Sequence, residues 1–170
     1  SCSHRAHASV SKITEFLPSF AGLQLETEIS ALKKVTTEIK KPITCIIGGS
    51  KISTKIDVIT NLIDKIDNLI IVGAMANNFF LYKNFNIGKS LVEANTKEII
   101  EKIYEKAKIN NCKIIIPEDC VVSSSFEGDG KNKNLDQIEN SEMILDIGVN
   151  TIKKIEYIID NYRAVSDRII

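Results

Sequence analysis

Residues Ile43 to Ile66, with the sequence ITCIIGGSKISTKIDVITNLIDKI, decide the fold of this chain. The apolar run at its start is typical of a strand buried in a parallel sheet, and Gly48-Gly49 lets the backbone turn sharply. Apolar residues then recur every three or four positions, which predicts a helix with one buried stripe. That stripe consists of Ile52, Ile56, Ile59, Ile63 and Ile66. The stretch therefore predicts a strand, a glycine turn and a helix.

Two lysines, Lys51 and Lys55, stand one turn apart at the start of this predicted helix. Cations at this end oppose the helix dipole and repel each other, whereas a bound anion would make both favourable. Together with free backbone N–H groups and a glycine turn, they suit a phosphate site at the end of a strand. Solvated surface lysines in a lysine-rich chain explain the pattern equally well. Neither G-x-x-x-x-G-K-[ST] nor G-x-G-x-x-G occurs, so the spacing alone indicates an anion site and no particular nucleotide fold.

The composition is that of an ordinary globular protein. The 170 residues are 44% hydrophobic and 26% charged, and Lys+Arg and Asp+Glu both total 22. A balanced charge favours neither nucleic acid nor an anionic membrane as a partner, and no apolar run is long enough to span a bilayer. The four cysteines form no C-x-x-C pair, which is typical of reduced thiols in a cytosolic protein. We therefore expect a cytoplasmic location.

The first nine residues, SCSHRAHAS, combine two histidines with an arginine. Cys2, His4 and His7 are possible metal ligands, but no fourth ligand follows at a recognisable spacing, so we expect no metal site. His4, Arg5 and His7 fit an anion-facing surface, and a solvated basic turn fits them as well.

A long helix is predicted over residues 17–40, although Gly22 interrupts the pattern near its start. Its apolar side carries Leu25, Ile29, Leu32, Val35 and Ile39. A helix of this size measures roughly 30 Å, which is enough to bridge two domains.

The rest of the chain alternates strands with helices. Strands are expected at 69–72, 112–116, 120–122 and 143–147, helices at 74–82, 96–107 and 151–162, and the start of a strand at 168–170. Asp119 is interpreted as a turn residue, and the polar segment 123–140 as an exposed excursion or short hairpin. This alternation predicts an α/β fold, a three-layer, doubly wound parallel sheet of the Rossmann-like kind.

Seven stretches together resemble the phosphoglycerate kinase family, in the same order and at similar intervals. They are SCSHRAHAS, LPSFAGLQLETEISAL, IIGGSKISTKIDVITNLIDKID, LIIVGAMANNF, IGKSLVE, IIPEDCVV and ILDIG. Members of this family are two-domain enzymes, and the chain is similar to their middle part. The resemblance implies the end of the substrate-binding N-terminal domain at residues 1–16, an interdomain helix at 17–40, and an incomplete nucleotide-binding domain at 41–170.

The resemblance also implies an activity, namely reversible phosphoryl transfer between ATP and 3-phosphoglycerate, giving ADP and 1,3-bisphosphoglycerate in glycolysis. Lys51 would attend the transferred phosphoryl group, while Gly48, Gly49 and Lys55 would meet the nucleotide phosphates. The adenine pocket would be lined by Gly73, Ala74, Leu91 and Leu145. Arg5, His4 and His7 would face the triose substrate.

The family further implies a monomer that uses ATP or ADP with Mg²⁺, although the family segment that holds the metal-bound phosphates is absent from these residues. For the same reason the fragment alone is expected to be inactive. Two alternatives stay open: a non-catalytic nucleotide-binding α/β domain, and a dinucleotide-dependent oxidoreductase. The oxidoreductase is disfavoured by the missing G-x-G-x-x-G and by the lysines in the turn.

Overall fold

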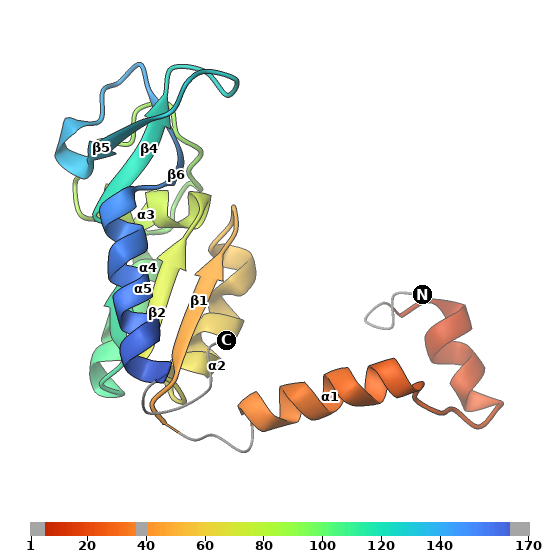
Figure 1. Ribbon diagram of the computed structural model, residues 1–170. Helices are drawn as coiled ribbons and strands as arrows, with labels where there is room; N and C mark the ends of the chain where they lie inside the picture. Colours follow the sequence, from red (N-terminus) through yellow and green to blue (C-terminus); the bar gives the residue numbers. More distant parts are fainter. Residues whose placement is uncertain (1–5, 37–40, 164–170) are drawn as a thin grey trace. The chain divides into compact units, whose positions relative to one another are not determined.

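The computed structural model describes residues 6–36 and 41–163 (Figure 1). The chain divides into two compact units, Ser1–Ile39 and Lys40–Ile170. The strand start predicted at 168–170 lies outside the described residues. Within the described ranges, no helix is long and apolar enough to cross a membrane.

The first unit holds a shorter helix than the sequence predicts. A π-helical turn at Ala8–Lys12 and a 3₁₀ turn at Ile13–Glu15 precede helix α1, Leu23–Thr36. The expected start near residue 17 is wrong because Pro18 disfavours a helical conformation at the residue before it, and Gly22 is a poor helix former. Helical hydrogen bonding begins where the Glu26 N–H donates to the Gly22 carbonyl, at 3.0 Å.

The second unit is built on a parallel sheet, sheet A, with the strand order β1-β2-β3. Figure 1 shows β1 beside β2 in this sheet. Its strands are Thr44–Gly48, Asn68–Val72 and Lys113–Ile115. The predicted α/β class and the parallel sheet are thus confirmed. Since β1 and β2 end in register at Gly48 and Val72, the turns that follow these two strands lie next to each other.

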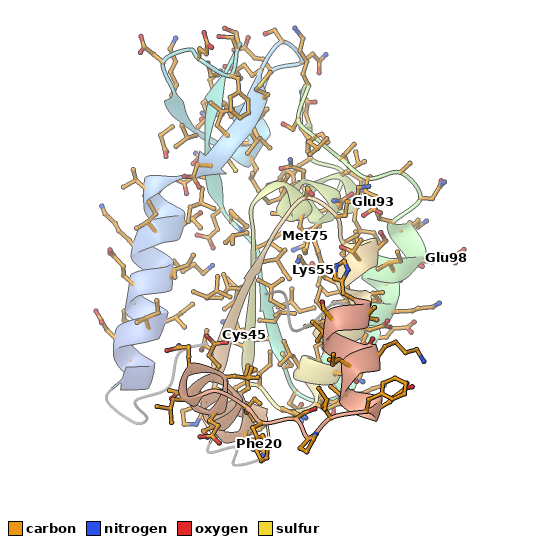
Figure 2. All side chains as sticks on the ribbon, turned by 90° about the vertical axis from the view of Figure 1, so that its right-hand side faces the viewer. Phe20, Cys45, Lys55, Met75, Glu93 and Glu98 are labelled. Atoms are coloured by element: carbon orange, nitrogen blue, oxygen red, sulfur yellow. The ribbon has the colours of Figure 1, made fainter. Side chains whose placement is uncertain are left out.

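Helices cover both faces of sheet A, which gives three layers. The helices of the second unit are α2 (Ile56–Ile63), α3 (Ala74–Tyr82), α4 (Lys97–Ile109) and α5 (Val149–Arg163). On one face Ile155 of α5 packs against Ile70 and Ile115. On the other face α2 and α4 contact each other, and Figure 2 shows them across the sheet from α5. Four of the five isoleucines of the predicted stripe are buried there, since Ile52, Ile59, Ile63 and Ile66 expose 1% or less of their surface, whereas Ile56 is half-buried.

A second sheet, sheet B, corrects the prediction that every strand belongs to one parallel sheet. Strands β5 (Lys131–Asn134), β4 (Asp119–Ser123) and β6 (Met143–Ile147) form it in that order, and both pairings are antiparallel. Only residues 116–118 separate β3 from β4, whereas a parallel neighbour requires a crossover of a dozen or more residues. The polar segment 123–140 does form the hairpin that was expected, with β5 as its returning strand and a 3₁₀ turn at Leu135–Gln137.

The interpretation of Asp119 as a turn residue is also wrong. Asp119 is fully buried at the start of β4, and its carboxylate caps the N-terminus of α5. It accepts hydrogen bonds from the N–H groups of Asn150 and Thr151, at 2.9 and 2.8 Å, from the Thr151 hydroxyl at 2.7 Å and from the Asn132 amide at 3.0 Å. Burial by itself would raise the pKa of this carboxyl, but these hydrogen bonds outweigh it and lower the pKa.

Three cysteines, Cys45, Cys112 and Cys120, are buried free thiols. Burial raises the pKa of all three, to about 11 for Cys112 and about 12 for Cys120. A thiol with a raised pKa is a poor nucleophile at neutral pH, so these residues serve as small apolar side chains of the core.

Candidate functional site

The lysine-bearing turn, residues 49–55, connects β1 to α2 through a loop and a short 3₁₀ turn. Residues 49–52 leave the strand, a 3₁₀ turn follows at Ser53–Lys55, and the α-helix begins only at Ile56. Buried Ile52 anchors the turn beneath exposed Lys51. The expectation that the two lysines stand one turn apart at the start of one helix is therefore corrected: Lys51 lies in the loop before the 3₁₀ turn, and Lys55 ends that turn.

Lys55 lies directly over the glycine turn. A Cβ atom added to Gly49 would stand 2.8 Å from Cε of Lys55 and 3.7 Å from its Nζ. Gly49 has a φ of 145°, a conformation that residues with a side chain rarely adopt. The glycine therefore provides both the turn and the space that the lysine side chain occupies. The Lys55 ammonium group lies near the Gly49 backbone at the carboxyl end of β1, where α/β sheets bind anions.

The turn after β2 packs against the turn after β1. Gly73 has a φ of 68°, and a Cβ at this position would stand 3.2 Å from the backbone nitrogen of Gly49. The Met75 N–H, in the first turn of α3, donates to the Gly49 carbonyl at 2.7 Å. Figure 2 shows Met75 and Lys55 close together at this end of the sheet. The two glycine turns therefore form one surface.

A pocket of about 420 Å³ opens beside Gly73, between α3, the loop that follows it and sheet B. Gly73, Ala74, Leu91 and Leu145, the four residues predicted for an adenine pocket, all line it. Its other apolar walls come from Ala76, Phe80, Pro117, Cys120, Phe126, Met143, Ile144 and Ile147. Three larger pockets, of about 580, 540 and 480 Å³, include no residue of either glycine turn. We regard the smaller pocket as the candidate site because it has apolar walls at the carboxyl ends of strands.

Polar side chains that the sequence reasoning missed hold the wall of this pocket. Asn77 is 1% exposed, and its amide donates to the Leu91 carbonyl at 2.9 Å. Ser90 accepts a hydrogen bond from the Ile144 N–H at 2.8 Å, which joins the loop to β6. The signal that could have found Asn77 is its position, beside Asn78, in a helix whose other residues up to Leu81 are apolar, since buried amides require partners.

The residues predicted to face the triose substrate all belong to the first unit. His4 and Arg5 lie outside the described residues. His7 is exposed in the first unit, and its carbonyl accepts hydrogen bonds from the N–H groups of Val10 and Ser11, at 2.9 and 2.8 Å. Their contact with substrate stays a prediction. Over the part of the chain that the structure describes, no group of three or more His, Cys, Asp or Glu side chains could hold a metal ion.

Comparisons with known proteins agree on one family. The family model described as "Phosphoglycerate kinase" matches residues 1–166. The phosphoglycerate kinase of Wolbachia pipientis subsp. Culex pipiens is 48% identical over 166 residues, covering 97% of this chain and 42% of the relative. That of Bartonella bacilliformis is 43% identical over 162 residues, covering 94% of this chain and 40% of the relative.

Solved structures lead to the same family. The phosphoglycerate kinase of Coxiella burnetii has a TM-score of 0.79 and 36% identity, covering 89% of this chain and 40% of its own. That of Pyrococcus horikoshii has a TM-score of 0.73 and 25% identity, covering 92% of this chain and 40% of its own. The chain spans about two-fifths of the length of these relatives. From the match over residues 1–166 and these identities, the chain belongs to the phosphoglycerate kinase family.

Proposed function

We propose that this chain is part of an enzyme that transfers a phosphoryl group reversibly between ATP and 3-phosphoglycerate. The observation that carries the proposal is the Lys55 side chain over the Gly49 turn, next to the apolar pocket beside Gly73. A purine base fits an apolar pocket of this size, and its phosphates would then extend towards the glycine turns. Membership of the family supports the choice of substrates.

In this proposal the two lysines act at different points of the reaction. Lys55 holds the phosphates of the nucleotide, while exposed Lys51 reaches the phosphoryl group in transit. Such transfer depends on positioning and on neutralising charge on the phosphate oxygens, and two ammonium groups supply both. His4, Arg5 and His7 would bind the triose substrate.

The Mg²⁺ that accompanies ATP in this family is assigned to no residue of this chain. The described residues contain no cluster of carboxylates that fits a cation, so the ion enters the proposal only as the partner of the nucleotide. We further propose a monomeric, cytoplasmic enzyme without nucleic acid or membrane partners. The formal net charge of zero supports the last of these points.

Two measurements test the proposal. First, the chain is titrated with ADP and ATP by calorimetry. Second, residues 1–166 replace the matching segment of the Wolbachia enzyme, and the kinase activity of this chimera is assayed. We expect nucleotide binding by the chain and an active chimera. Binding with an inactive chimera would favour the non-catalytic nucleotide domain instead. Failure to bind either nucleotide would contradict the phosphate site itself.

A further inference from the structure

Glu93 lies against the lysine-bearing turn, although 40 positions separate it from Ser53 in the sequence. The Ser53 N–H donates to its carboxylate at 3.2 Å, and the Ser53 hydroxyl donates to the other carboxylate oxygen. Figure 2 shows Glu93 near Met75 and Lys55. The carboxylate therefore occupies the start of the 3₁₀ turn that leads into α2.

A continuous series of hydrogen bonds connects this carboxylate back to the glycine turn. The Glu93 N–H donates to Oδ1 of Asn78 at 3.0 Å, and the Asn78 amide donates to the Met75 carbonyl at 3.3 Å. Met75 in turn donates its N–H to the Gly49 carbonyl at 2.7 Å. The loop from Gly49 to Ser53 is thus fastened at both ends to the first turn of α3 and to the loop at Glu93.

Lys51 stands in the middle of this fastened loop. Its side chain is exposed, and among the described residues it forms no ion pair, so its ammonium group is available to a ligand. Besides the two attachments described above, the Thr54 hydroxyl donates to the Lys51 carbonyl at 3.1 Å, and the buried Ile52 side chain anchors the loop beneath Lys51. Ser53 begins the 3₁₀ turn that ends at Lys55, so freeing Ser53 would let both Lys51 and Lys55 shift. A displacement of about 1 Å at a group that positions substrate costs binding or rate strongly.

A glutamate is a costly choice beside a phosphate site, since like charges repel. The hydrogen bonds from Ser53, and the attraction of Lys51, lower the pKa of Glu93, so the carboxylate is ionised at neutral pH. A charged acceptor forms stronger hydrogen bonds than a neutral one. The stronger bonds from Ser53 therefore offset the repulsion between the Glu93 carboxylate and a bound phosphate.

We propose that Glu93 is a positioning residue that holds the turn carrying Lys51 and Lys55 in place by fixing Ser53. The inference rests on the proposed function, because it assigns to Glu93 the geometry of the phosphate-binding turn. Glu93 itself need not touch the nucleotide.

The test compares Glu93→Ala with Glu93→Gln in this chain, with Glu98→Ala as the matched control. A glutamine keeps one acceptor oxygen for Ser53 and loses the charge, whereas alanine removes both. Glu98 is an exposed glutamate in the first turn of α4, five residues along the chain (Figure 2). Three quantities are measured: the melting temperature, amide hydrogen exchange at Ser53 by NMR, and the Kd for ADP by calorimetry.

We expect Glu93→Ala to raise both the exchange rate of the Ser53 amide and the Kd for ADP by about tenfold, the low end for a hydrogen bond to a charged group, because Ser53 begins the turn that ends at Lys55. Glu93→Gln should stay within about threefold of the wild type in both quantities, because its remaining oxygen still accepts. Glu98→Ala should change neither.

The inference and the proposed function fail in different ways. If the wild type binds ADP and Glu93→Ala leaves Ser53 exchange and the Kd unchanged, the positioning role is wrong and the nucleotide site stands. If Glu93→Gln weakens binding as much as Glu93→Ala while Ser53 stays protected, Glu93 acts through its charge and the inference is overturned. If the wild type does not bind ADP, the proposed function fails, and the inference that depends on it fails as well.

Discussion

Replacing Asp119 by alanine should destabilise the second unit more than any other single change to an acidic side chain that we consider. The carboxylate is fully buried and accepts four hydrogen bonds. Two come from the Asn150 and Thr151 N–H groups in the first turn of α5, which have no acceptor of their own within the helix. Because the same carboxylate binds the Asn132 amide of β5, its removal loosens sheet B and α5 together.

The size of the effect follows from these contacts. Loss of an N-cap costs about 1 kcal/mol, and leaving the buried Thr151 hydroxyl without its closest acceptor costs about 1 to 2 kcal/mol more. Asn132 is exposed, so water can replace its bond at little cost. The free energy of unfolding should therefore fall by roughly 2 to 3 kcal/mol, which corresponds to a decrease in Tm of roughly 6 to 12 °C for a unit of this size.

The assay is urea denaturation of the wild type, Asp119→Ala and the exposed control Asp129→Ala at pH 7. The pH dependence gives a second readout. Since the pKa of Asp119 is lowered in the folded chain, its contribution to stability is present above about pH 4 and disappears as the pH falls through the folded-state pKa. Asp119→Asn should lack that acid-dependent part. A loss below about 0.5 kcal/mol, the usual range for an exposed site, would refute the capping role.

Three further predictions concern the glycine turn, the core thiols and the reaction. Gly73→Ala should lower the melting temperature and weaken ADP binding, because φ at this residue is 68° and the new Cβ would stand 3.2 Å from the Gly49 backbone nitrogen. Gly22→Ala is the control, since nothing lies within 4 Å of a Cβ at Gly22. Equal effects of the two substitutions would contradict the argument. Burial raises the pKa of Cys112 to about 11 and that of Cys120 to about 12, so both thiols should react with a disulfide reagent at pH 8 only after denaturation. Mass spectrometry follows the labelling. Rapid labelling of the native chain would show that the two thiols are accessible. Lys51→Ala in the Wolbachia chimera should lower kcat by roughly 10²-fold with a smaller change in KM, and an unchanged kcat would remove Lys51 from the reaction.

The regular part of the fold could be predicted because local patterns specify it. The isoleucine spacing in residues 52–66 identifies the buried side of a helix, and the run at 69–72 identifies a buried strand whatever its neighbours are. The direction of each strand relative to its neighbours could not be predicted in the same way. A short apolar run such as residues 120–122 or 143–147 carries no information on its partner, and only the three-residue linker 116–118 indicated that β4 could not continue the parallel sheet.

The candidate site was predictable in its backbone and much less so in its polar contacts. Gly49, Gly73 and Lys55 belong to recognisable turns, and the structure brings them together. Asp119 and Glu93 were missed because their partners lie 32 and 40 positions away, and their roles depend on tertiary contacts that no local periodicity records.

The central claim, that the glycine turn under Lys55 binds nucleotide phosphates, is tested most directly by calorimetric titration of the chain with ATP. The wild type is compared with Lys55→Ala and with Lys102→Ala, which removes an exposed lysine of α4. We predict that Lys55→Ala raises the Kd by about tenfold or more, as expected for the loss of one charged hydrogen bond to phosphate, and that Lys102→Ala leaves the Kd unchanged. Equal Kd values for all three proteins would contradict the claim and return Lys55 to the solvated surface.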